Sequence, residues 1–141
     1  MKKLFSISFL ALAIGGLVVA AHAYEEVASV HDIMEVVQKP SMDAIVAIAK
    51  AGGPQSEKDW KSVKMHASIL AESTQLILMG GRVKDEAWTK GADQVIAAAK
   101  ETMAAADKMD ADGFKAGSGG LGRGCRTCHN VHKPKEEKKA E

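Results

Sequence analysis

The chain has 141 residues, with 19 Lys and Arg against 18 Asp and Glu, two cysteines, and aromatic side chains at only 4% of positions. This length suits one domain, and the near-neutral charge gives no support to nucleic-acid binding, which requires a basic surface. Because aromatic residues are scarce, we expect alanine, aliphatic and methionine side chains to fill much of the core.

Residues 1–23 have the pattern of an export signal. Lys2 and Lys3 form a cationic start, residues 4–20 are apolar, and Ala21-His22-Ala23 matches the small-x-small site of a signal peptidase. The sequence therefore predicts cleavage after Ala23 and a periplasmic mature protein. Cleavage would remove two basic residues and no acidic ones, leaving a formal charge of −1.

An uncleaved membrane anchor is the alternative, because the apolar run is about as long as the shortest membrane-spanning helices. No later segment is long and apolar enough to span, so we expect no membrane span in the mature form.

The first helical pattern runs from Val27 to Ala51. Apolar side chains recur there at helical spacing: Val30, Ile33, Met34, Val37, Ile45 and Ile48. Pro40 lies in the middle and lacks a backbone donor, so it is expected to kink or split this helix. Gly52-Gly53-Pro54 then ends it.

Two longer helical patterns follow. The second runs from Ser56, a candidate N-cap with Asp59 at the third helical position, to about Met79, before Gly80-Gly81. The third runs from Asp85 to about Met109. Their predicted core positions are Trp60, Val63, Ala67, Leu70, Thr74 and Ile77 on the second, and Trp88, Ala92, Val95, Ala99, Met103 and Ala106 on the third.

The remaining chain contains a glycine-rich stretch, Gly113 to Gly124, which predicts a loop. A short fourth helix is expected from Arg123 to about Lys133, and residues 134–141 read as a disordered charged tail. No alternating strand pattern is present. The fold class is therefore all-α, and short glycine-containing connections favour an antiparallel up-down-up-down four-helix bundle over residues 24–133.

The segment Cys125-Arg126-Thr127-Cys128-His129 carries the chemistry. It matches the sequence that attaches haem c, in which two thiols on one helical turn form thioethers with the vinyl groups and the adjacent histidine binds the iron. The alternatives are a redox disulfide, which usually lies in a βαβ setting, and a zinc site, for which His132 is the only additional ligand candidate nearby.

An export signal, three amphipathic helices and one CxxCH near the C-terminus resemble the class II c-type cytochromes, the cytochrome c′ and cytochrome c556 group. The resemblance implies a four-helix bundle with one covalent haem between the helices and His129 as the fifth iron ligand. It also implies that Met34, on the first helix, is the sixth ligand, as in the low-spin c556 type.

The resemblance leaves several positions open. Core packing is the alternative role for Met34, and Met42, His31, His66 or a vacant position are the alternatives for the sixth site. The family has Arg-Gln near the haem propionates where this chain has His31-Asp32. Arg123 could compensate the propionates instead, although a solvated surface charge is the simpler explanation.

The functional expectation is a single-haem electron carrier, not an enzyme. The alternative is a five-coordinate, cytochrome c′-like protein that binds NO or CO, and a weaker one is haem peroxidase-like activity with His31 or His66 as the distal acid-base group. Redox partner proteins are the expected partners. The resemblance also implies a homodimer that pairs through the first two helices.

Overall fold

The computed structural model describes residues 25–132, so the predicted export signal and the predicted charged tail lie outside the described residues. The elements in chain order are α1 (Val30–Ile33), a π-helical turn (Met34–Gln38), α2 (Lys39–Lys50), α3 (Glu57–Leu76), a 3₁₀ turn (Gly80–Arg82), α4 (Glu86–Lys108) and α5 (Ala111–His132). Since α1, the π turn and α2 are continuous, they form one rod.

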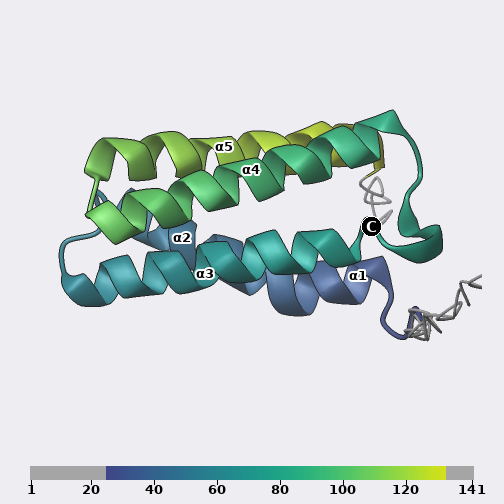
Figure 1. The fold of residues 1–141 in the computed structure, drawn as a ribbon, viewed down its shortest axis with the longest axis horizontal. Helices are drawn as coiled ribbons and strands as arrows, with labels where there is room; N and C mark the ends of the chain where they lie inside the picture. The colour runs from purple at the N-terminus through teal and green to yellow at the C-terminus, as the bar shows by residue number, and fades with distance from the viewer. Residues whose placement is uncertain (1–24, 133–141) are drawn as a thin grey trace, which may run out of the picture.

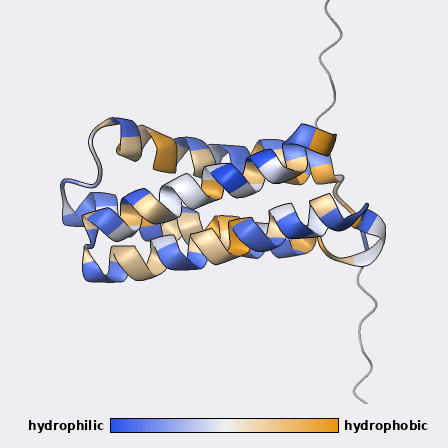
Figure 2. Ribbon diagram, turned by 90° about the horizontal axis from the view of Figure 1, so that it is seen from above, coloured by the Kyte–Doolittle hydropathy of each residue, from blue (hydrophilic) through white to orange (hydrophobic). Residues whose placement is uncertain are grey.

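The four rods make an all-α four-helix bundle, which confirms the predicted fold class for the described residues. Consecutive rods pack side by side and are joined at alternating ends (Figure 1). Polar and apolar segments alternate along each helix, as expected for amphipathic helices around a shared core (Figure 2). None of the helices in residues 25–132 is both long and apolar enough to cross a bilayer.

Pro40 divides the first rod without breaking it. The π turn ends immediately before α2, where the Lys39 N–H bonds to the Met34 carbonyl, and Pro40 occupies the first turn of α2. Proline has no N–H to donate to the preceding turn, and the change to π winding accommodates this loss within a continuous helix. The predicted interruption is therefore a change in winding, not a loop.

The predicted helix starts are confirmed by their caps. Ser56 Oγ accepts a hydrogen bond from Asp59 N at 3.2 Å at the start of α3. The Asp85 carboxylate accepts one from Trp88 N at 2.9 Å at the start of α4. α3 ends at Leu76, about three residues before the predicted end, and α4 ends within a residue of its predicted end, with Met109 in the left-handed conformation.

The glycine-rich stretch is helical, so the predicted loop over Gly113 to Gly124 is wrong. The residues predicted as a fourth helix from Arg123 are helical up to His132, but the predicted start and short length are wrong, because α5 begins at Ala111. The glycines serve packing against α4: a Cβ at Gly124 would lie 2.8 Å from the Val95 backbone nitrogen, and one at Gly117 would lie 3.0 Å from that of Thr102. Tertiary packing thus overrides the low helix propensity of glycine.

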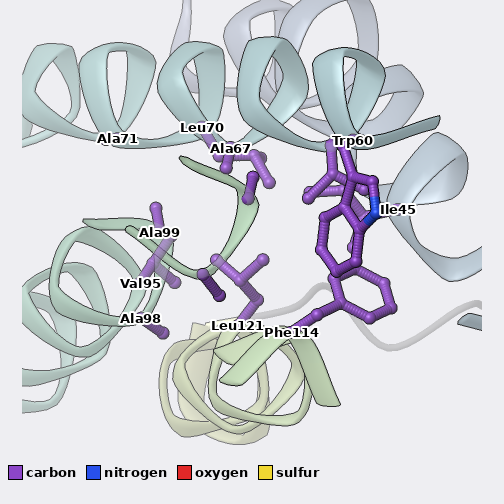
Figure 3. Packing of buried hydrophobic residues seen from close by; sticks show 13 residues of the cluster. Ile45, Trp60, Ala67, Leu70, Ala71, Val95, Ala98, Ala99, Phe114 and Leu121 are labelled. Carbon is purple, nitrogen blue, oxygen red and sulfur yellow. The ribbon is translucent and has the colours of Figure 1, made fainter. Parts of the chain in front are cut away.

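The main core lies between α2, α3, α4 and α5 (Figure 3). Trp60 of α3 and Phe114 of α5 meet edge to face there, with ring centroids 6.2 Å apart. All the predicted core positions of α3 and α4 are buried except Met103, which is partly buried against the same core. The helical spacing in the sequence therefore identified the core faces of both helices.

Candidate cofactor-attachment site

A second apolar cluster occupies one end of the bundle, where α1, the end of α3, the start of α4 and the end of α5 meet (Figure 1, right-hand end). We call it the terminal cluster. Its buried members are Ile33, Ile77, Trp88, Ala92 and Cys128, and the partly buried side chains packed against it are Val30, Met34, Leu76 and Leu78. The cluster thus contains one predicted thioether residue and the predicted sixth ligand.

The cysteine motif lies on the last turns of α5. Cys128 is 6% exposed within the terminal cluster, whereas Cys125 is half-buried against the main core, and no disulfide joins the two. His129 is exposed. At 100° per residue, His129 lies about 40° around the helix from Cys125. The three side chains therefore share one side of α5, as attachment to a single planar group requires.

Met34 begins the π turn and packs against the terminal cluster from the opposite side of the bundle. Met34 and Cys128 therefore border the same apolar cluster. Met42 packs against the main core instead, and His31 is exposed on α1.

His66 lies on α3, eleven residues before Ile77, which corresponds to about 16 Å along the helix axis. Its Nδ1 is buried and has no hydrogen-bond partner among the described residues. Of the candidates for the sixth ligand, Met34 is therefore the one that packs against the cluster containing Cys128.

Arg123 lies elsewhere on α5. It is exposed and lines a shallow groove between α4 and α5 together with Gln94 and Glu101. Helical geometry puts it about 160° around α5 from Cys125. The structure does not bring Arg123 to the terminal cluster, and this placement gives no support to a role beside the cysteines.

Burial raises the pKa of both cysteine thiols above the ordinary value. Redox-active cysteines have the opposite property, a lowered thiol pKa, which a helix N-terminus or a neighbouring cation provides. Here the pair lies near the C-terminus of α5, where the helix dipole disfavours a thiolate. The environment therefore argues against the thiol-disulfide alternative.

The zinc alternative also gains no support. Within residues 25–132, no group of three or more His, Cys, Asp and Glu side chains is arranged to hold a metal ion. The two thiols and His129 lie on one side of α5, which is the arrangement that the haem alternative requires.

Trp88 of α4 packs in the same cluster as Cys128, and it contacts His132 of α5. Trp88 donates its indole N–H to the Ile77 carbonyl at 2.9 Å, and the His132 ring meets Trp88 edge to face at 5.4 Å between centroids. His132 Nε2 lies 3.0 Å from Asp85 Oδ1. The hydrogen bond from Trp88 N, followed by that with His132, lowers the pKa of the Asp85 carboxyl.

The group of Trp88, His132 and Asp85 was not predicted from the sequence as part of the site. The available signal was the spacing of His132, four residues after Cys128, which puts both side chains on one face of α5.

Arg82 is a second residue that the sequence analysis missed. It follows Gly80-Gly81 in the connection between α3 and α4, yet its side chain is only 4% exposed. Its guanidinium donates to the Leu76 carbonyl at 2.9 Å and to the Ala28 carbonyl at 2.7 Å. No sequence periodicity marks a residue in a connection, so the pattern gave no signal for it.

Comparisons of the chain with protein-family models, with curated proteins and with solved structures found no significant match in any of the three. The fold and the local geometry are therefore the observations from which a function is argued.

Proposed function

We propose that the protein is an exported single-haem c-type cytochrome, similar to the class II group, that carries electrons between redox partner proteins. The observation that supports it most strongly is the shared cluster: Cys128 of the CxxCH motif and Met34 of the first rod pack into one apolar end of the bundle. The CxxCH motif would attach the haem covalently, and the apolar side chains of the terminal cluster would surround the haem with a low-polarity environment.

The two thiols would hold the group covalently. Each thiol would add across one vinyl group, so that a sulfur–carbon bond would form and the thiol hydrogen would go to the other vinyl carbon; this addition would require no external oxidant. The bound haem supplies a one-electron iron couple. His129, next to Cys128 in the chain, supplies an imidazole nitrogen to the metal.

Met34 is the proposed sixth ligand because its side chain is partly buried against the cluster that contains Cys128. A thioether ligand stabilises the reduced metal and raises the reduction potential, which suits an electron carrier. The five-coordinate, gas-binding alternative requires Met34 to act only as a packing residue.

The test of haem attachment uses the full-length chain, expressed with a c-type haem maturation system and recovered from the periplasm. We expect a protein that begins at Tyr24, whose mass includes one covalently bound haem. The matched control is Cys125→Ala/Cys128→Ala, which keeps the rest of the chain and should carry no covalent haem. A wild-type protein without added haem mass would refute the proposal.

Optical spectra of the same protein test the ligand set. Wild-type protein should give low-spin spectra in both oxidation states, and Met34→Ala should convert it to a high-spin form that binds carbon monoxide rapidly. Met42→Ala is the control, since Met42 packs against the main core. A wild-type spectrum that is already high-spin, unchanged by Met34→Ala, would favour the gas-binding function instead.

A further inference from the structure

The residues that precede α1 are attached to the connection between α3 and α4. The Glu26 carboxylate accepts a hydrogen bond from Gly81 N and lies 3.9 Å from Arg82 Nε. The buried Arg82 guanidinium bridges the Ala28 carbonyl and the Leu76 carbonyl. One side chain therefore links the N-terminal segment to the C-terminal end of α3.

This attachment continues directly into α1. Ser29, the residue after Ala28, caps the helix: its Oγ accepts from Asp32 N at 3.1 Å, and the Asp32 carboxylate accepts from Ser29 N at 3.3 Å. Ile33 then enters the terminal cluster, and Met34 follows it. From Ala28 to Met34 the backbone has no loop in which a displacement could be absorbed.

Met34 lies in the second turn of its rod, and helix ends open more readily than helix centres. A hydrogen-bonded anchor immediately before the N-cap opposes that opening. Because buried guanidinium groups make charge-assisted bonds, their loss leaves two carbonyls without their donors and is costly.

We propose that Arg82 is a positioning residue for the sixth iron ligand: by holding Ala28 against the end of α3, it keeps α1 closed and Met34 in the terminal cluster. The inference rests on the proposed function insofar as Met34 ligates iron. Arg82 acts through the backbone of residues 28–34, because its guanidinium bonds to the Ala28 carbonyl directly before the N-cap of α1.

The experiment compares Arg82→Met, which keeps the length of the side chain but removes its donors, with Arg82→Lys and Glu26→Gln in the purified haem-containing protein. Glu26→Gln keeps the buried arginine and weakens its half-exposed partner, so it provides a mild perturbation if Arg82→Met folds poorly. The matched control is Lys64→Met, which breaks the exposed ion pair with Asp107, 2.5 Å long and remote from α1.

Two measurements are made on each variant. In hydrogen–deuterium exchange, Arg82→Met should accelerate exchange of the amides of residues 30–38 about tenfold or more. In carbon monoxide binding to the reduced protein, the association rate should rise by a similar factor, since carbon monoxide must displace Met34. Arg82→Lys should raise the amide exchange rate and the carbon monoxide association rate less than Arg82→Met does. Lys64→Met should leave both rates at their wild-type values.

The proposal would be overturned if Arg82→Met exchanged the amides of residues 30–38, and bound carbon monoxide, at the same rates as the wild-type protein. Faster exchange confined to the end of α3 would also overturn it, because Arg82 would then serve only as a cap for that helix. A wild-type protein without haem would refute the proposed function itself, and this result is obtained before any variant is compared.

Discussion

Alanine at Gly124 should destabilise the protein, whereas alanine at Gly122 should stabilise it, although both positions lie in the same turn of α5. Each substitution gains helix propensity, worth about 1 kcal/mol for glycine to alanine. They differ in what the added methyl group meets. At Gly122 the nearest atom is Arg126 Nη1 at 3.5 Å, the movable tip of a flexible side chain.

At Gly124 the added Cβ would lie 2.8 Å from Val95 N, also 2.8 Å from Val95 Cγ2, and 3.2 Å from the Gln94 carbonyl carbon. Ordinary contact begins at 3.4 Å, so the space is about 0.6 Å too small, and a backbone neighbour cannot rotate away. Overpacking costs about 1–3 kcal/mol, and because the backbone neighbour here cannot move aside, we take the upper part of that range, about 2–3 kcal/mol. After the propensity gain, we expect Gly124→Ala to lose about 1–2 kcal/mol.

Urea denaturation of the mature protein, followed by circular dichroism, gives both free energies of unfolding. Gly122→Ala should gain about 0.5–1 kcal/mol, so the two variants should differ by about 1.5–3 kcal/mol. Gly119→Ala is a second control, since Arg123 Nη1, at 3.4 Å, is the only neighbour. Equal stability of Gly122→Ala and Gly124→Ala would refute the close approach of α4 and α5.

Three further predictions concern the helix ends. Met109 has φ 51° and ψ 37° after α4, a left-handed conformation that glycine adopts without strain. Met109→Gly should therefore raise the free energy of unfolding by about 0.5–1 kcal/mol, and a lower urea midpoint would contradict this. Ser56→Ala removes the cap of α3 and should cost about 1 kcal/mol in the same assay, whereas an unchanged midpoint would show that the cap is dispensable. The pKa of Asp85 is lowered in the folded protein, so its contribution to stability is present above the ordinary value of 3.8 and is lost as the pH falls through the lowered pKa. Asp85→Asn, which retains a capping side chain, should therefore weaken the loss of stability in acid, and identical pH dependence in urea titrations would contradict this.

The sequence was most informative where one helix buries one face. In α3 and α4 the apolar positions repeat at helical spacing and the N-caps Ser56 and Asp85 have side-chain oxygens, so local pattern and tertiary structure agree. The prediction failed in α5 because glycine has two opposite effects on a helix. It weakens an isolated helix, but against α4 it allows an approach that a larger side chain would prevent.

The candidate site was predictable only in part. Cys125, Cys128 and His129 are adjacent in the chain, so their shared surface follows from helical geometry alone. The packing of Met34 against the same cluster depends on the path of a different rod, and a resemblance in layout suggested it. Arg82 and Trp88 act through contacts between segments far apart in the chain, which spacing within one segment does not reveal.

The contact between α4 and α5 has a consequence for how ordered the two sides of the site are. Much of it is built from glycine and alanine, which lose no side-chain rotamer entropy on folding, and it brings the two backbones into direct contact. On the other side, the contacts are made by Met34, Leu76 and Leu78. These flexible side chains lose rotamer entropy when packing immobilises them. The half of the molecule that carries the cysteines is therefore ordered at a lower cost in side-chain entropy than the half that carries the methionine.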